Sequence, residues 1–492
     1  MKVHTPKTSF FLAAVICMFA MMQPAHAVTG KSFLMPRPTN QDAVLMHSLT
    51  HNFVSNTEIK NPLALSATVF YEQSTNAKGL ARYFFPNNKT ELTIRTDVTA
   101  GPTDIWAGDL NIIGKDDPVT HDQLPFSSKI KIRPERKHFG FVLQGLKKFE
   151  LFKRFFLQVD VPFVQVEHNV NFTEFDVVNA AQNHQGLPSL LGGATDARLD
   201  FLIVTNATEA FNGPALHHAK IKDGTQKLAG IADINLKIGY EALRGASGYL
   251  QLFTNFIIPM GYEPKAEFLF EPLIGNGRHF GLGVGLEGDI LIRKKDRFDI
   301  TLFGMLDVNY LFEDGELRTF DLKSRGPWSR YILVTDPDFL NLSQFFPAAD
   351  YLTLRAKITP RVVFNFMTQL ACNFHAFDIN FGYNLWARSS EKVALKGEPK
   401  EGLNIDDNAL SIAIPHLGGV AAFNTPLTKD DINLDSAKNP EVVKHTLFSD
   451  VRIHGCFHDN PMMYRFGAKY TLSQSNRSTD EWGLFMSCNI LV

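Results

Sequence analysis

The sequence is poor in the features that mark several large classes of protein. Beyond residue 27 it has no uncharged apolar run of the roughly 18 residues that a membrane-spanning helix requires. Its four cysteines, at positions 17, 372, 456 and 488, have neither the spacing of a disulfide framework nor that of a zinc site. The formal net charge is only −2, which argues against a nucleic-acid-binding surface. Helical membrane proteins, disulfide-rich proteins and nucleic-acid partners are therefore disfavoured.

The sequence also lacks the common enzyme motifs, since G-x-S-x-G, H-E-x-x-H and the Walker loop are absent. Residues 283–288 match G-x-G-x-x-G, but these glycines lie inside an alternating stretch instead of between a strand and a helix, where a dinucleotide site needs them. His454, Cys456 and His458 would share one face of a strand but lack a complete metal ligand set. We expect no catalytic residue, no cofactor and no metal.

The first 27 residues have the pattern of an export signal. Lys2 and Lys7 precede an uncharged apolar run at 10–22, and Ala25 and Ala27 supply the small residues at −3 and −1 of a cleavage site. The apolar run is too short to span a membrane as a helix. We expect cleavage after Ala27 and export of the mature chain.

In place of long apolar runs, the chain has many short stretches in which apolar and polar residues alternate. In residues 232–242, for example, the even positions are apolar and the odd positions are mostly polar. A strand with one face in lipid and one in water alternates in this way, whereas a helix would scatter the apolar residues. The predicted strands are 62–73, 128–149, 155–169, 229–243, 247–261, 278–294, 297–313, 349–374, 376–389, 445–458, 463–473 and 482–492.

The connections between these stretches alternate between short and long. The short ones lie near 150–153, 244–246, 295–296, 375 and 459–462, and the long ones near 74–127, 170–228, 262–277, 314–348 and 390–444. Outer-membrane barrels have short periplasmic turns and long extracellular loops. We therefore predict an all-β fold, a transmembrane antiparallel β-barrel of about 12 strands over residues 62–492. A soluble secreted β-protein is the alternative.

Two segments outside this rhythm need separate predictions. Residues 28–61 alternate weakly, and we expect a periplasmic N-terminal extension, a plug or an extra strand there. The loop 74–127 contains the apolar runs 83–85 and 104–106, which are unsuited to a freely solvated loop. We expect this loop to pack onto or into the mouth of the barrel.

The charged residues on the polar faces of the strands are the candidate pore-lining residues. A charge on the lipid face near the midplane would cost about 2–4 kcal/mol for Arg or Lys, so these side chains should face the lumen. One sector comprises Asp233, Lys237, Glu241, Glu287, Asp289, Arg293, Arg297, Asp299 and Asp307, and the other comprises Arg355, Lys357, Arg361, Arg388, Arg452, Arg465 and Lys469. They form either a conduit with an acidic wall opposite a basic wall or a set of ion pairs that fills a closed lumen.

With the export signal, the hairpin rhythm and the alternating last strand (482–492), the chain resembles the porin-like outer-membrane β-barrel proteins of double-membraned bacteria. The resemblance is architectural and covers roughly residues 62–492. It implies residence in the bacterial outer membrane, contact with outer-membrane lipid and insertion by the barrel-assembly machinery. Such barrels commonly end on an aromatic residue, and this chain departs from that pattern by ending on Val492.

These observations favour a narrow porin or solute-selective channel for small solutes, with loops 74–127 and 170–228 constricting its mouth. The alternatives are a hydrophobic-solute transporter with a plug at 28–61 and a structural or adhesive barrel with a closed lumen. A membrane-embedded hydrolase is disfavoured because the nucleophile motif is missing. The sequence specifies neither the solute nor the oligomeric state.

Overall fold

A computed structural model gives the structure of the chain. It describes residues 28–47, 62–110, 112, 114–115, 124–149, 154–180, 204–214, 216–335, 345–374, 376–400, 404–406 and 424–492. The expected signal peptide (1–27) and the second part of the expected N-terminal extension (48–61) lie outside the described residues.

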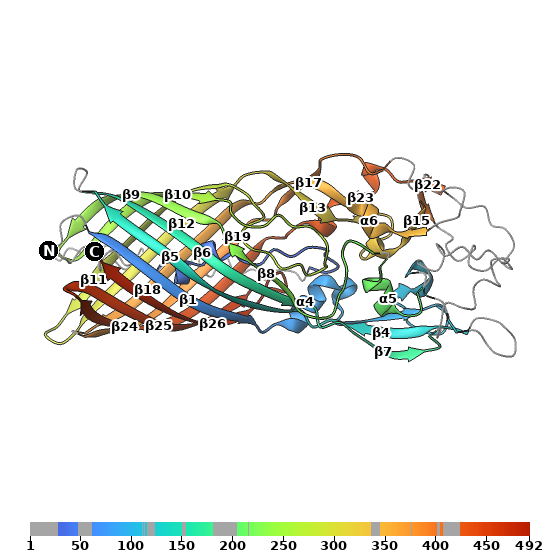
Figure 1. Cartoon of the computed structure of the whole chain (residues 1–492), viewed down its shortest axis with the longest axis horizontal. Helices are drawn as coiled ribbons and strands as arrows, with labels where there is room; N and C mark the ends of the chain where they lie inside the picture. The colour runs from blue at the N-terminus through green and yellow to red at the C-terminus, as the bar shows by residue number, and fades with distance from the viewer. Residues whose placement is uncertain are drawn as a thin grey trace, which may run out of the picture.

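Twelve antiparallel strands form a closed barrel (Figure 1). They are β1 (Leu63–Ser74), β5 (Glu135–Lys148), β6 (Phe155–Asn169), β9 (Ile234–Gly245), β10 (Gly248–Ile258), β11 (Gly281–Lys294), β12 (Asp299–Leu311), β18 (Arg361–Asn373), β19 (Phe377–Arg388), β24 (Val442–Phe457), β25 (Asn460–Ser473) and β26 (Glu481–Leu491). Sequential neighbours pair around the ring, β1 pairs with both β5 and β26, and β5 pairs with β6 to close it. A further strand, β8 (Gln226–Ile231), pairs with the second half of β6.

The predicted fold class and strand number are confirmed, with three differences in the strands. The predicted strand 229–243 covers the end of β8 and the start of β9, which residues 232–233 separate. The predicted strand 128–149 is two strands, because β4 (Ser127–Lys131) leaves the wall and pairs with β2 and β7. The predicted strand 349–374 divides into β17 (Thr353–Thr359) and β18. Pro360 has no N–H to donate, and Arg361 has a φ of 69°, so the ladder ends between them.

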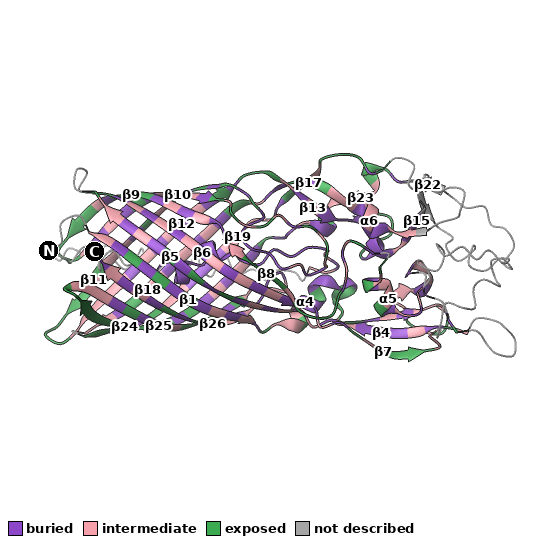
Figure 2. Ribbon diagram, in the orientation of Figure 1, coloured by how far each residue is buried: buried purple, intermediate pink, exposed green. Residues whose placement is uncertain are grey.

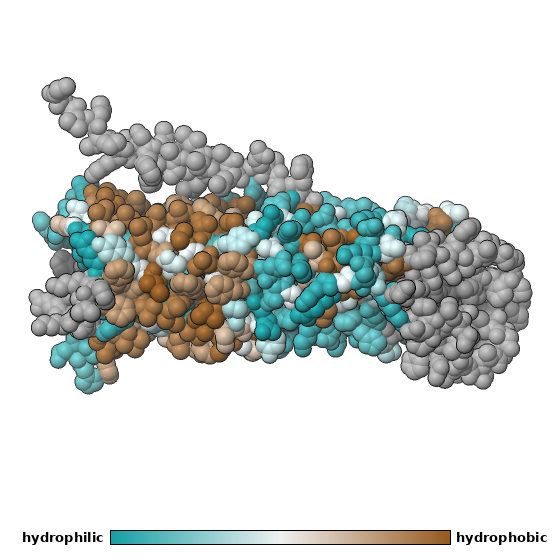
Figure 3. Space-filling model, turned by 90° about the horizontal axis from the view of Figure 1, so that it is seen from above, coloured by the Kyte–Doolittle hydropathy of each residue, from teal (hydrophilic) through white to brown (hydrophobic). Residues whose placement is uncertain are grey.

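The outer surface of the barrel carries an apolar belt. Burial alternates residue by residue along the strands (Figure 2), and each of the twelve strands turns large apolar side chains outward. Val69 on β1, Phe141 on β5 and Leu447 on β24 are examples that are 39–65% exposed. Figure 3 shows these side chains as a continuous brown band over the barrel half of the molecule, next to a hydrophilic half. An exposed apolar area of this extent needs a lipid environment.

The two ends of the barrel differ strongly. The short connections and the C-terminal residue Val492 lie at one end, here called the turn end (Figure 1). The long connections lie at the other and form a second body, here called the loop domain: the described parts of 75–134, 170–233, 259–280, 312–360, 389–441 and 474–480. In outer-membrane barrels the turn end is periplasmic and the loop end extracellular.

The loop domain has its own small sheets and helices. Its sheets are β3-β2-β4-β7, β13-β17-β20, β14-β23 and β16-β15-β21-β22. Their bounds are β2 (Glu91–Arg95), β3 (Ile105–Trp106), β7 (Thr173–Val178), β13 (Asp314–Thr319), β14 (Asp321–Leu322), β15 (Leu333–Thr335), β16 (Phe345–Pro347), β20 (Lys392–Leu395), β21 (Asn404–Asp406), β22 (Asn424–Pro426) and β23 (Ile432–Asn433). The α-helices there are α4 (Ala77–Phe84), α5 (Ala207–Asn212) and α6 (Ala348–Leu352).

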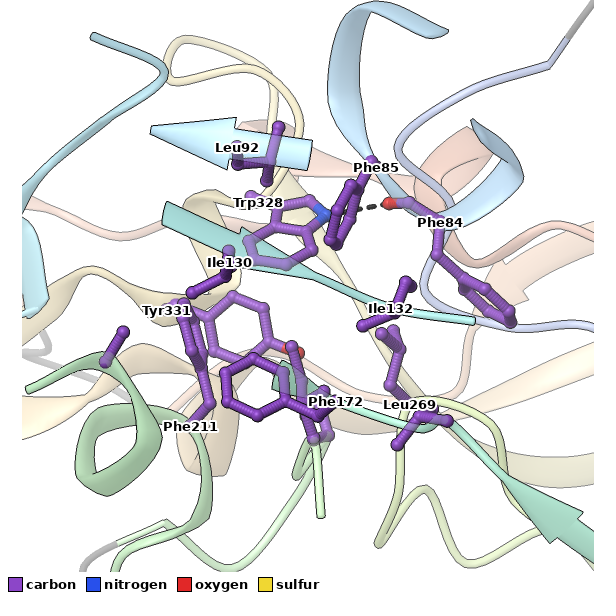
Figure 4. Packing of buried hydrophobic residues seen from close by; sticks show 14 of the residues in the cluster. Phe84, Phe85, Leu92, Ile130, Ile132, Phe172, Phe211, Leu269, Trp328 and Tyr331 are labelled. Atoms are coloured by element: carbon purple, nitrogen blue, oxygen red, sulfur yellow. Dashed lines mark hydrogen bonds between the residues drawn. The ribbon is translucent and has the colours of Figure 1, made fainter. Parts of the chain in front are cut away.

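An aromatic core holds the loop domain together (Figure 4). The Trp328 ring packs edge-on against Phe85 and Phe211, with centroids 5.2 and 5.4 Å apart. Its indole N–H donates to the Phe84 carbonyl at 2.7 Å, so the buried polar atom has a partner. Tyr83, Phe84 and Phe85 are fully buried. The apolar run 83–85 therefore packs in the interior at the mouth of the barrel, as the sequence predicts.

A buried carboxyl makes the stability of the loop domain depend on pH. Burial raises the pKa of Glu271 from 4.5 to about 7, although the backbone N–H of Ala266 donates to it at 2.8 Å. A folded pKa above the unfolded value means that stability is full below about pH 4.5 and falls as the pH rises through about 7. We expect a loss approaching about 3 kcal/mol.

Thermal unfolding measured between pH 5 and 8 tests this expectation. Glu271→Gln should flatten the pH dependence and stabilise the loop domain at pH 8, while Glu267→Gln, an exposed neighbour, should leave the dependence as in the wild type. If Glu271→Gln and the wild type keep the same slope, the buried carboxyl is not the cause.

Candidate solute pathway

Residues 28–47, here called the lumenal segment, begin in the loop domain. The backbone N–H of Val28 donates to Oδ1 of Asn476 at 3.1 Å, and the Asn476 amide donates back to the Val28 carbonyl at 2.7 Å. The Tyr83 hydroxyl donates to the carbonyl of Phe33 at 2.6 Å. These contacts fix the start of the segment at the loop end of the barrel.

The segment then runs through the lumen toward the turn end, and polar side chains bond it to the inner face of the barrel on several sides. The bonded pairs are Thr39–His138 on β5 (2.9 Å), Asn40–Asn235 on β9 (3.2 Å), Gln41–Asn365 on β18 (3.0 Å), Gln41–Trp386 on β19 (3.2 Å), Val44–Arg465 on β25 (3.0 Å) and Met46–Gln144 on β5 (2.6 Å). Since these strands lie all around the ring, the segment spans the width of the lumen.

On the turn-end side of these contacts, the short helix α2 (Ala43–Met46) inserts an apolar layer into the lumen. Oδ1 of Asp42 caps the helix by accepting from the N–H of Val44 at 3.1 Å. All four helix residues are buried and pack with inward apolar side chains of six strands, namely Phe70, Val142, Met305, Met367, Phe448 and Phe485. This layer closes the otherwise polar interior of the barrel.

A vestibule of about 800 Å³ lies on the turn-end side of this layer. His47, at the end of the segment, stacks on the inward ring of Phe303 with centroids 4.1 Å apart, and both rings line the vestibule. Arg452 lines it too, as do Asp378 and His454, whose side chains are 2.8 Å apart. The His47–Phe303 pair therefore borders the vestibule on the side of the apolar layer.

One side of the lumen, here called the paired wall, is a network of direct ion pairs. It comprises β5, β1, β26, β25 and β24, together with Arg37 and Asp42 of the lumenal segment. The pairs are Arg37–Asp42, Lys469–Asp42, Lys469–Glu72 (2.5 Å), Arg136–Glu481 (2.5 Å), Lys444–Glu481 (3.0 Å), Arg452–Asp450 (3.2 Å) and Arg465–Asp450 (2.9 Å). Six cations thus face four carboxylates, all with side chains at most 6% exposed.

The other side, here called the acidic wall, comprises β6, β9, β10, β11 and β12 and has few cations. Asp160 accepts from the amides of Gln144 and Gln158, at 2.7 and 2.8 Å, and Asp307 accepts from Asn309 at 2.8 Å. Glu287 accepts from the amide of Gln251, also on this wall. Neutral amides, not cations, are the bonded partners of these three carboxylates among the described residues.

The structure brings half of the sequence-predicted pore residues to the buried interior. These are Asp233, Lys237, Glu241, Glu287, Asp307, Arg452, Arg465 and Lys469. Asp289 and Asp299 line the vestibule, and Arg388 lies at the loop end of β19, where it donates to Asn439 at 2.8 Å. Arg293 and Arg297 are exposed at the β11–β12 turn. These two arginines lie at the rim of the barrel because β11 ends at Lys294.

Three predicted residues lie away from the lumen, which corrects the expected basic sector. Arg355 and Lys357 are on β17, outside the barrel sheet, and pair with Glu263 (2.9 Å) and Glu313 (3.8 Å). Arg361 is exposed and donates to the carbonyl of Ser390 at 2.9 Å. The break at Pro360 places Arg355 and Lys357 outside the wall, and Arg361, the first residue of β18, is exposed at the end of that strand.

Sequence reasoning missed several inward charges. Asp160 on β6 and Arg136 on β5 occupy polar positions of predicted strands, so the alternation contained a signal for both. The lumenal residues Arg37, Asp42 and His47 lie in a segment without periodicity. A plug is one of the three expectations for residues 28–61, but the sequence singles out none of these three residues.

The described part of the chain lacks the groupings of a metal site and of a helical membrane span. It contains no group of three or more His, Cys, Asp or Glu side chains that could hold a metal ion. It also contains no helix long and apolar enough to cross a membrane. The glycines of the 283–288 motif lie in β11, where Gly285 makes room for the Phe253 ring; a Cβ there would come within 2.3 Å of it.

The closed even-numbered ring, the apolar belt, the polar lumen and the short-turn and long-loop ends define a transmembrane β-barrel of the outer-membrane type. A barrel of this type resides in the outer membrane of double-membraned bacteria, where its apolar belt faces membrane lipid. No protein-family model matches it, and no curated protein matches it significantly.

Several solved barrels have a similar architecture. An outer-membrane channel from Pseudomonas putida F1 matches over 91% of this chain and 100% of its own, at 9% identity and a TM-score of 0.38. The translocator domain of the autotransporter NalP from Neisseria meningitidis matches over 89% and 90%, at 6% identity and 0.31. A Pseudomonas aeruginosa FadL homologue matches over 95% and 98%, at 7% identity and 0.29. The fold assignment itself rests on the strand pairing of this chain.

Proposed function

We propose that this protein is a gated, solute-selective channel for small polar solutes, closed in this structure by the lumenal segment. The observation that carries the proposal is that residues 28–47 cross the lumen and are held there by noncovalent contacts, namely hydrogen bonds, ion pairs and the apolar packing of α2. Noncovalent contacts of this kind can be broken and re-formed, so the segment acts as a plug with two positions. Insertion of the barrel by the barrel-assembly machinery is part of the proposal.

The chemistry of the lumen favours polar over hydrophobic solutes. Buried charges line both walls, and the apolar layer around α2 is the exception in this interior. A solute rich in hydrocarbon would have to displace water from these charged groups without replacing their hydrogen bonds, which is costly. The charged vestibule, in contrast, offers a polar solute partners up to the His47–Phe303 pair.

A cross-link between the plug and the wall tests the proposal. Asn40→Cys with Asn235→Cys replaces a bonded pair of the lumenal segment and β9, in a chain whose Cys372, Cys456 and Cys488 are changed to Ser. We expect channel openings in planar bilayers to vanish on oxidation and to return on reduction.

The matched control joins wall to wall. Thr446→Cys with Thr471→Cys replaces a bonded pair of directly opposed residues on the neighbouring strands β24 and β25, and oxidation should leave its openings unchanged. Openings that persist in the oxidised 40–235 pair would show that solutes pass without movement of the segment. If neither the reduced chain nor a variant with a loosened plug ever conducts, the barrel is sealed and its role is structural or adhesive.

A further inference from the structure

The acidic wall presents one continuous acceptor surface to the lumen. Lys237 on β9 lies opposite Gln158 on β6 and Asn255 on β10. Gln251 lies opposite Glu287 in the next pair of strands. Because adjacent strands are about 4.8 Å apart, the surface extends roughly 19 Å around the wall from β6 to β12.

Four oxygen atoms on this surface have no hydrogen-bond partner among the described residues. They are Oδ2 of Asp160, Oε1 of Gln251, Oδ1 of Asn255 and Oδ1 of Asp307, on side chains at most 9% exposed. Two of them belong to neutral amides, so the need for donors does not follow from the carboxylates alone. A buried acceptor without a donor costs about 1–3 kcal/mol, and a ligand that supplies N–H groups would recover that energy.

The charge of the acidic wall points to the same kind of ligand. Asp160, Glu287 and Asp307 outnumber the single cation among them, Lys237. The Lys237 ammonium lies over the Phe253 ring, 5.2 Å from its centroid, and makes no ion pair within 4.0 Å in the described structure. Negative charge is thus left over in a desolvated surface, where it attracts a cation strongly.

The paired wall does not offer a matching site for anions. Its cations outnumber its carboxylates, but each one is already engaged: Arg465, for example, donates to Asp450 and to the carbonyl of Val44. Lys469 is shared between Asp42 and Glu72. An anion would therefore have to compete with carboxylates in place, whereas a cation meets open acceptors on the acidic wall.

The spread of the acceptors sets the size of the cation. The described residues hold no compact group that could coordinate a bare metal ion. Acceptors spaced along several strands instead suit ammonium and guanidinium groups, whose N–H donors point in several directions, and hydrated monovalent ions.

We propose that the acidic wall makes the open channel selective for small cations, in particular organic ammonium and guanidinium compounds. The inference rests on the proposed channel function and names its substrate class. Asp160, Glu287 and Asp307 supply the charge, Gln251 and Asn255 supply neutral acceptors, and Lys237 limits how tightly a cation binds, so that it can leave.

Zero-current potentials across a bilayer with a salt gradient test the proposal, with potassium chloride and methylammonium chloride as probes. The full chain carries Asp42→Asn, which removes the carboxylate that ties the plug to Lys469. We expect a cation-to-chloride permeability ratio of about ten. Adding Asp160→Asn, Glu287→Gln and Asp307→Asn should bring the ratio close to one.

Two further variants keep the result decisive. Lys237→Gln should raise the permeability ratio. If the triple variant does not fold, as loss of its heat-modifiable gel mobility would show, this single variant still tests the proposal. Asp223→Asn with Asp296→Asn and Asp314→Asn neutralises three exposed carboxylates and should leave the ratio unchanged. If the channel conducts but neither the triple variant nor Lys237→Gln changes the permeability ratio, the cation inference alone is overturned. A complete absence of current would overturn the channel function and this inference with it.

Discussion

Asp42→Asn is expected to open the barrel. The Asp42 carboxylate lies between two cations, Arg37 on the lumenal segment and Lys469 on β25, and all three side chains are at most 3% exposed. Without the carboxylate, the two cations repel each other across the boundary between plug and wall. Breaking a buried pair of this kind costs about 3–5 kcal/mol, so we expect the open probability to rise by about two to three orders of magnitude.

Single-channel recording of the purified full chain measures this effect, and Asp42→Glu provides the comparison because it keeps the charge. Asp430→Asn, an exposed carboxylate of the loop domain, should behave like the wild type. Equal open probabilities for Asp42→Asn and the wild type would show that the ion pairs of the plug do not control opening.

Glu481→Ala is expected to have the largest effect on stability. Glu481 on β26 accepts from Arg136 on β5 at 2.5 Å and from Lys444 on β24 at 3.0 Å. It therefore links five consecutive strands of the ring, from β5 to β24. Its loss leaves two buried cations without a carboxylate, and we expect the free energy of unfolding to fall by about 3–5 kcal/mol.

Denaturant titration in detergent checks this loss, with heat-modifiable gel mobility as the readout of the folded fraction. Glu441→Gln is the matched control: it breaks the ion pair with Arg477, but the Glu441 side chain is 57% exposed, so the cost should stay below about 1 kcal/mol. Similar losses for the two variants would mean that burial does not set the strength of these pairs.

Much of the barrel could be predicted from the sequence because its signal is local. Lipid on one side and water or protein on the other impose alternation on each strand, and the turn lengths then give the order of the strands. The prediction from alternation is wrong at residues 349–374, because β17 continues the same pattern outside the barrel wall. Only the proline at 360 marks the boundary, and alternation alone cannot tell a wall strand from a loop-domain strand.

The interior could be predicted only in part. Alternation shows which face of a strand Lys237 or Arg465 occupies, but not which charges meet across the lumen. The lumenal segment is further out of reach, because Asn40 meets a partner 195 residues away and Gln41 one that is 324 residues away. Such contacts depend on the closed ring, which no local pattern describes.

The path of the lumenal segment also constrains how the protein is made. Val28 lies at the loop end, His47 lies near the turn end, and β1 begins at Leu63 beside the last residue of the chain. The chain is thus threaded through the ring that its own first and last barrel strands, β1 and β26, complete. Residues 28–47 must therefore either lie inside before β1 and β26 pair or be threaded along the lumen of the closed ring afterwards.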